Sequence, residues 1–250
     1  MSITIPTEPY TSHQTHTFNL LTGRHITAHV HEDPNNPNDS YIVVYQAYSK
    51  GIADAVVNEQ GFKDAARAAG WKESRMTWIK PGFLWMMYRS GWATKPSQTS
   101  ILAIKVRLPF FLHMLQISLP ARLSNASVEF KHQKPDIIIQ WDPSHSPNGT
   151  VIQSLRAIQI GIRGGTETNR RFASGEEWVG VEDVTEFVES MKGVSGFREG
   201  ESVRGGQRDD GEYEGLVVPV ERLVVVSEEL REIAGADSLP HDWECTVPFV

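Results

Sequence analysis

The sequence has a single cysteine, Cys245, among its 250 residues. It can therefore form no intramolecular disulfide and no cysteine-rich zinc site, which favours a reducing compartment. No apolar run approaches the roughly 20 residues that span a bilayer. Residues 1–10 lack the basic-then-apolar order of a signal peptide. Together these absences predict a cytoplasmic protein that does not contact membranes.

Several motifs that carry familiar chemistry are also missing. The stretch Gly161 to Gly165 follows a predicted strand, yet it lacks the lysine of a phosphate-binding loop and the full glycine pattern of a dinucleotide site. We interpret it as a turn and predict no cofactor. His29 and His31 alternate as on a strand, but no third ligand lies at a metal-binding spacing. A polar strand over residues 24–30 is the favoured interpretation, and no metal is predicted.

The net charge of −7 conceals two regions of opposite sign. Residues 1–125 carry 12 Lys and Arg against 8 Asp and Glu, whereas residues 126–250 carry 12 against 23. Within residues 63–122 there are 10 basic side chains and only 2 acidic ones. An evenly acidic protein would repel nucleic acid, but this distribution allows one basic and one acidic surface.

Residue patterns predict an α+β fold. Residues 41–48 and 100–107 are rich in β-branched and aromatic side chains, which is typical of strands. Further strands are predicted at 136–141, 157–163, 178–181 and 216–226, and helices at 51–58, 62–69, 82–89, 110–117, 183–191 and 227–234. Because strands and helices do not alternate regularly, we expect a single domain, residues 1–250, with a mixed and mostly antiparallel sheet flanked by helices. Residues 1–40 are predicted to form a polar N-terminal extension, and the glycine-rich stretch 193–215 a flexible loop.

The densest chemical signal lies between Arg75 and Lys95. This segment mixes aromatic and basic side chains, namely Arg75, Trp78, Lys80, Phe83, Trp85, Tyr88, Arg89, Trp92 and Lys95. Several tryptophans are expected in the core, but the cations cannot all be buried, because an unpaired buried charge is very unfavourable. A surface of cations and aromatic rings suits phosphates and unstacked bases. The segment is therefore a candidate nucleic-acid site, with a buried Arg89 paired to a carboxylate as the alternative.

A second cluster is acidic and includes Glu182, Asp183 and Glu186. The simpler interpretation is a solvated helix start in which Asp183 is the N-cap residue. The functional interpretation is a group of carboxylates that accepts a proton or binds a cation. A guanidinium is the cation that paired carboxylates bind best, through bidentate hydrogen bonds.

Three segments carry a resemblance to a known family: VYQAYSKGIADAV (44–56), RMTWIKPGFLWMMYRSGWATK (75–95) and AIQIGIRG (157–164). They resemble a widespread bacterial and fungal family of unknown function, over roughly residues 40–190. Within it, the chain is similar to the fungal branch associated with arginine-containing cyclodipeptide synthases. That branch has an acidic motif of the Asp-Asp-x-x-Glu type, and Glu182-Asp183-Val184-Thr185-Glu186 matches it except for Glu in the first place.

The resemblance implies an enzyme that uses arginyl-tRNA and a second aminoacyl-tRNA to make a cyclo-arginine-Xaa diketopiperazine, without ATP or another cofactor. On this basis Glu186 is expected to be the general base, with Glu182 and Asp183 orienting the arginine. Lys80 and Arg89 are expected to contact the tRNA 3′ end, and Trp78 or Trp85 to stack on its bases. The remaining expected substrate contacts are Tyr45, Gln46, Tyr48, Arg75 and Tyr88.

Two other functional classes remain open at this point. A strand and helix over residues 41–57, together with a late glutamate, resemble an ADP-ribosyltransferase-like enzyme that would use NAD. The basic and aromatic segment alone would also fit a non-catalytic RNA-binding module.

Overall fold

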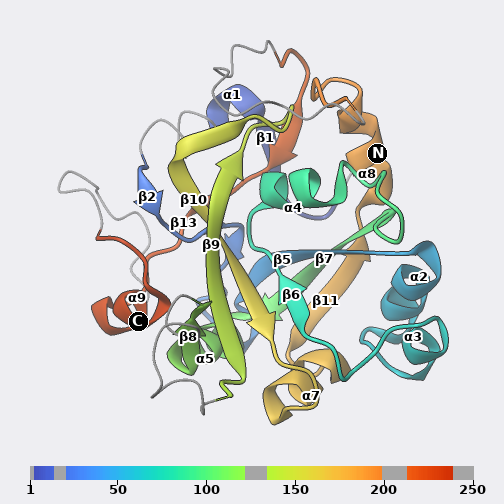
Figure 1. Cartoon of the computed structure of the whole chain (residues 1–250), viewed down its shortest axis with the longest axis vertical. Helices are drawn as coiled ribbons and strands as arrows, with labels where there is room; N and C mark the ends of the chain where they lie inside the picture. The colour runs from blue at the N-terminus through green and yellow to red at the C-terminus, as the bar shows by residue number, and fades with distance from the viewer. Residues whose placement is uncertain (1–2, 14–20, 122–133, 199–212, 239–250) are drawn as a thin grey trace.

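Two sheets that meet at a single backbone bridge form the centre of the molecule (Figure 1). The computed structural model describes residues 3–13, 21–121, 134–198 and 213–238. In these residues helices and mostly antiparallel sheets alternate irregularly along the chain, which confirms the predicted α+β class.

The first sheet has the strand order β11-β7-β5-β4 and is antiparallel throughout. Its central strands are β5 (Tyr41–Tyr48) and β7 (Ser100–Arg107), as predicted, and β11 (Trp178–Asp183) and β4 (Val30–His31) lie outside them. Residues of β5 and β7 are buried on both faces, which explains why the two strands are apolar almost without interruption.

The second sheet contains the long antiparallel pair β9 (Ile137–His145) and β10 (Val151–Ile162). Strands β6 (Thr77–Ile79) and β2 (Gly23–Arg24) pair with β10, and β8 (Ser118–Pro120) pairs with β9. The β2–β10 and β8–β9 pairs are parallel, so this sheet is mixed.

The two sheets are joined where Tyr45 of β5 and Lys80, the residue after β6, exchange backbone hydrogen bonds of 2.7 and 3.2 Å. This bridge fixes the end of β5 against β6. It thereby brings together two of the segments on which the family resemblance rests.

Each face of the first sheet covers a separate hydrophobic core. Ile42, Val44 and Leu102 face a core shared with β9 and β10, whereas Val43 and Ile101 face a core on the opposite side. Helix α4 (Phe83–Ser90) and helix α8 (Thr185–Lys192) cover the second core. The helix predicted over residues 82–89 is α4, whose N-cap residue is Gly82.

Two short strand pairs connect the N-terminal residues to the rest of the fold. Strand β1 (Thr7–Pro9) pairs with β12 (Val217–Pro219), and β3 (Thr27–Ala28) pairs with β13 (Arg222–Leu223). Apolar side chains of the stretch that was predicted as a polar extension are buried, among them those of Ile5 and Leu21. Most of the glycine-rich stretch, residues 199–212, and Cys245 lie outside the described residues.

The remaining helices are α1 (Tyr10–His13), α2 (Lys50–Glu59), α3 (Asp64–Ala68), α5 (Leu108–Gln116), α7 (Glu167–Ser174) and α9 (Glu228–Ala234). Helix α7 was not predicted. The strand predicted over 24–30 is divided among β2, β3 and β4, and that predicted over 216–226 between β12 and β13. None of the described helices combines the length and apolar character needed to cross a bilayer.

Candidate functional site

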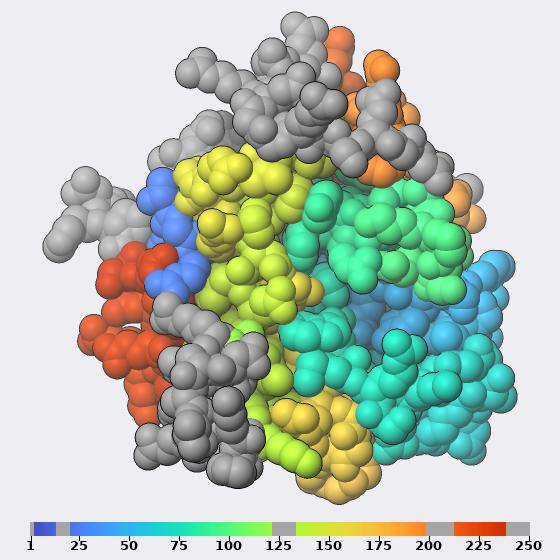
Figure 2. Space-filling model, viewed as in Figure 1, coloured from blue at the N-terminus to red at the C-terminus, as the bar shows by residue number. Residues whose placement is uncertain are grey.

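A cavity of about 770 Å³ opens where the two sheets meet. Its walls come from the end of β5 and the start of α2, from the segment 69–78 that includes β6, from α4 and the turn after it, and from β9 and β10. Figure 2 shows this face hollowed between α4 above and the segment before β6 below, with the blue β5–α2 segment at the bottom of the hollow. The volume lies within the range of about 300–1,000 Å³ that is usual for small-molecule sites.

All three segments that carry the family resemblance contribute to this cavity. Trp78 of β6 lies directly opposite Gly161 of β10 in the strand register. A Cβ on Gly161 would lie 3.0 Å from the Trp78 ring and 2.8 Å from Met76 Sδ, closer than such atoms normally approach. The glycine therefore allows the half-buried indole to lie across β10 and form part of the wall.

The cavity is lined by four cations, Lys72, Arg75, Lys80 and Arg89. All four come from the basic stretch 63–122. Lys72, Arg75 and Arg89 are exposed at the opening. Among the described residues, no carboxylate lines the cavity. The cavity is therefore electropositive and suits an anionic ligand such as a phosphodiester.

Lys80 differs from the other three cations because it is only 6% exposed. Burial, assisted by the Arg89 guanidinium and opposed by Asp142, lowers the pKa of its amine from 10.5 to about 8. No described carboxylate forms an ion pair with it, and its amine donates a long hydrogen bond of 3.4 Å to the Trp78 carbonyl. The sequence identified Lys80 as a cation but gave no indication of its burial.

Gln46 lies beside Lys80 on the same wall. Its Nε2 donates to the same Trp78 carbonyl at 3.0 Å, whereas its buried Oε1 accepts no hydrogen bond within the described structure. Tyr48, two residues after Gln46 on β5, also lines the cavity. Burial raises the pKa of the Tyr48 hydroxyl, so it remains a neutral hydrogen-bonding group. Gln46 and Tyr48, two of the residues predicted to contact the substrate, thus line the cavity.

Sequence reasoning missed a pair of glutamines on the far wall. Gln140 of β9 and Gln159 of β10 are cross-strand partners, and both line the cavity. The side-chain amides of both donate to Asp142, at 2.8 Å from Gln140. No described residue donates to their side-chain oxygens, which can therefore accept hydrogen bonds from a ligand. The available signal was a glutamine within each of two short apolar runs, residues 137–141 and 157–162.

Three of the predicted aromatic contacts do not line the cavity. Tyr45 is fully buried on the opposite face of β5, because successive side chains of a strand alternate. Burial raises the pKa of its hydroxyl well above 10, and the ring packs edge-on against Phe83. Trp85 and Tyr88 of α4 stack on each other and on His145, with the Trp85 and His145 ring centroids 5.4 Å apart.

The predicted catalytic carboxylates lie elsewhere, on β11 and α8. Glu182 accepts hydrogen bonds from Thr4 and forms an ion pair of 3.7 Å with Lys105. Asp183 accepts a hydrogen bond of 2.8 Å from the Thr185 amide at the start of α8, while Val184 occupies the N-cap position. Glu186 is exposed in the first turn of α8. None of the three lines the cavity.

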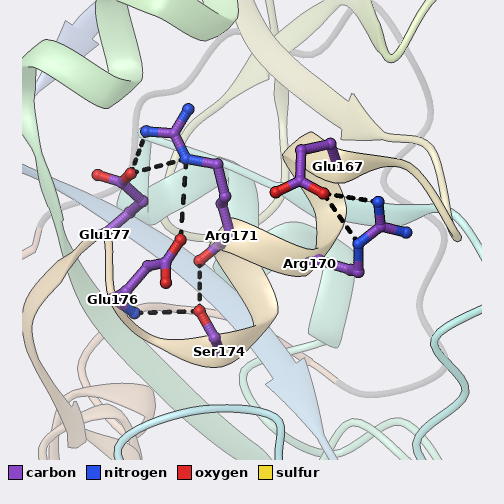
Figure 3. Close-up of polar contacts among 6 residues, drawn as sticks. All are labelled: Glu167, Arg170, Arg171, Ser174, Glu176 and Glu177. Atoms are coloured by element: carbon purple, nitrogen blue, oxygen red, sulfur yellow. Dashed lines mark hydrogen bonds and ion pairs between the residues drawn. The ribbon is translucent and has the colours of Figure 1, made fainter.

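Other members of the acidic half already hold a guanidinium of the protein itself. Figure 3 shows Arg171 of α7 donating to Glu177 through Nε at 2.9 Å, with Glu176 3.8 Å from the same nitrogen. Neighbouring Arg170 pairs with Glu167 one turn away on the same helix. Glu167 and Glu177 are therefore already paired within the fold.

The side chains at hand suit an organic anion better than a metal ion. Amines, guanidinium groups and amides line the cavity, whereas divalent metals need carboxylates, imidazoles or thiolates. In the described ranges, no group of three or more His, Cys, Asp or Glu side chains is arranged to hold a metal.

Comparison with protein-family models shows the family of the chain. A model described as a domain of unknown function (DUF4291) matches residues 34–222. The chain belongs to this family. The match includes every residue named above that lines the cavity. No curated protein matches the sequence significantly.

Proposed function

We propose that this member of the DUF4291 family condenses amino acids from arginyl-tRNA and a second aminoacyl-tRNA into an arginine-containing cyclodipeptide. The observation that carries the proposal is the electropositive, partly aromatic cavity, to which all three segments that carry the family resemblance contribute. In this proposal the cavity receives the aminoacylated 3′ end of a tRNA.

The groups at the cavity have the chemistry that the tRNA end would require. Lys72, Arg75 and Arg89 at the opening would contact phosphates, and the Trp78 ring offers a surface on which a base can stack. The basic patch and the lack of carboxylates among the described lining residues support a polyanionic ligand over a neutral one.

The reaction needs positioning and proton transfer more than activation. An aminoacyl-tRNA ester is already activated, so the enzyme must hold two esters together, remove a proton from the attacking amine and stabilise an oxyanion. In the proposal, the side-chain oxygens of Gln140 and Gln159 accept hydrogen bonds from the arginine guanidinium, with the carboxylate of Asp142 behind them. Glu182, Asp183 and Glu186, the predicted catalytic carboxylates, lie outside the cavity.

The test is a product assay. Purified protein is incubated with arginine, mixed amino acids, tRNA, aminoacyl-tRNA synthetases and ATP, and cyclo-arginine products are measured by mass. We expect products that ribonuclease abolishes. A parallel incubation with NAD tests for ADP-ribosyl transfer, which would replace the proposal. Binding of tRNA without any product would favour the RNA-binding module.

A matched pair of variants links the product to the cavity. Arg75→Gln removes a cation at the opening, whereas Arg170→Gln removes an exposed cation of α7 that lies outside the cavity. We expect Arg75→Gln to raise the KM for charged tRNA several-fold and to weaken the salt dependence of binding. Equal KM values for the two variants would contradict this placement of the tRNA end.

A further inference from the structure

Lys80 combines three properties that a structural lysine does not need. It is almost fully buried, it opens into the cavity, and no described carboxylate forms an ion pair with it. A charged amine in this environment is strongly disfavoured. Lys80 therefore loses its proton far more readily than a surface lysine, and its lone pair becomes available inside the cavity.

The side chain of Gln46 provides a second hydrogen-bond acceptor beside the Lys80 amine. Lys80 Nζ and Gln46 Nε2 both donate to the Trp78 carbonyl, at 3.4 and 3.0 Å, so the two side chains lie next to each other. The Gln46 amide nitrogen is used in this contact, and no described residue donates a hydrogen bond to its buried Oε1. A neutral Lys80 and this oxygen together present two adjacent acceptors to the cavity.

An ammonium or amine on the ligand matches this pair of acceptors. A phosphate or a carboxylate, which has no hydrogen to donate, could bond neither to the Gln46 oxygen nor to the lone pair of a neutral lysine. The anionic part of the ligand is instead met by the three exposed cations at the opening. The arrangement thus distinguishes the two ends of a ligand that carries an amine at one end and phosphates at the other.

We propose that Lys80 is the catalytic base that takes the proton from the α-amine of the bound aminoacyl ester, while Gln46 Oε1 accepts a second hydrogen bond from that amine. The assignment rests on the proposed function, and it places the base in the cavity rather than at Glu186. Lys80 thus acts on the reacting nitrogen, and Gln46 is a positioning residue.

In each step Lys80 accepts one proton and then returns it. The α-amine attacks the carbonyl carbon of the second ester, a C–N bond forms, and the proton lost by the nitrogen goes to neutral Lys80. The ester C–O bond of the tetrahedral intermediate then breaks, and the Lys80 ammonium gives the same proton to the departing ribose oxygen. Cyclisation repeats the sequence on the remaining ester. Two amide bonds form, two ester bonds break, and no ATP is consumed.

Several charged or titratable groups surround the proposed base: Arg89 of α4, Asp142 of β9, Tyr48 of β5, and Lys72 and Arg75 of the segment before β6. Arg89 favours the neutral amine and Asp142 favours the ammonium. An amine that titrates near neutrality can act as base in the first half of each step and as acid in the second.

The experiment compares Lys80→Met with Lys63→Met, which removes an exposed lysine at the N-cap position of α3, outside the cavity. With charged tRNAs as substrates, we expect Lys80→Met to lower kcat at least 100-fold with little change in the Kd for tRNA. Lys63→Met should keep wild-type activity. The wild-type rate should rise with pH, and the midpoint of this rise should lie near pH 8. A carboxylate base would give a midpoint several pH units lower.

Chemical rescue separates a catalytic role from a structural one. In Lys80→Ala, added primary amines should restore product formation, more strongly for amines that fit the space left by the side chain. Product from Lys80→Met at the wild-type rate, or no rescue of Lys80→Ala, overturns the assignment while the proposed function stands. If wild-type protein makes no product with any charged pair, the proposed function fails, and the assignment fails with it.

Discussion

Replacing Lys80 by methionine should stabilise the protein at neutral pH. The amine is buried without an ion-pair partner among the described residues, and its pKa falls from 10.5 to about 8. This difference of about 2.5 pKa units corresponds to roughly 3 kcal/mol of native-state destabilisation when the amine is charged. Methionine fills a similar volume without a charge, so it removes most of this penalty.

The stability difference between wild type and Lys80→Met depends on pH. Below pH 8 the lysine is protonated in both states and the full penalty is present. Between pH 8 and 10.5 the unfolded chain binds more protons than the native protein, so the wild-type free energy of unfolding rises with pH. The advantage of Lys80→Met should therefore be about 3 kcal/mol at pH 7 and should shrink towards pH 10.5.

Urea unfolding at pH 7 and pH 10 measures this difference through the midpoint and the m-value. The control Lys63→Met removes an exposed lysine and should change stability by no more than about 0.5 kcal/mol at either pH. A Lys80→Met variant that is less stable than wild type at pH 7 would refute the reasoning, because it would mean that the ammonium is stabilised by a partner in the native state.

Three further substitutions test other parts of the structure. Burial raises the pKa of Glu221, which accepts a hydrogen bond from the Phe83 amide at the start of α4, from 4.5 to about 8. Wild-type stability should therefore fall by up to about 4 to 5 kcal/mol between pH 4.5 and 8, and Glu221→Gln should remove that fall in urea unfolding at pH 5 and 8. Thr166→Ala removes the side-chain N-cap of α7 and should lower stability by about 1 kcal/mol, measured by the same method. Gly161→Ala places a methyl group against Trp78 and should cost about 1 to 3 kcal/mol and weaken tRNA binding in a filter assay. No change in either quantity would refute the packing described for this glycine.

Local patterns predicted the central strands and the helix over the second core. Strands 41–48 and 100–107 have the predicted bounds because a run of β-branched residues buried on both faces has few other conformations. The basic stretch 63–122 likewise supplied all four cations of the cavity. These features depend on short-range pattern and composition, which a single sequence displays.

Features that depend on pairing between distant segments were not visible in the sequence. Helix α7 is polar apart from Phe172 and Ala173, so it lacks the apolar periodicity that reveals a helix. The burial of Lys80 follows from its bridge with Tyr45, 35 positions away in the chain. The Gln140–Gln159 pair requires the register of β9 and β10, which no local motif specifies.

The position of the acidic motif in the fold was likewise not visible in the sequence. Its spacing was compatible with a catalytic group, but Glu182 and Asp183 lie on β11, at the edge of the first sheet, and their side chains already have partners within the fold. Position relative to the cavity, rather than residue type, separates these carboxylates from Gln46 and Lys80.

The central claim is that the cavity joins amino acids delivered by tRNA, and the amount of cyclo-arginine product tests it most directly. Wild-type protein supplied with arginyl-tRNA and a mixed pool of other aminoacyl-tRNAs should form ribonuclease-sensitive cyclo-arginine dipeptides, and Lys80→Met should form at least 100-fold less. Absence of any such product from folded wild-type protein, with every charged pair supplied, would contradict the account.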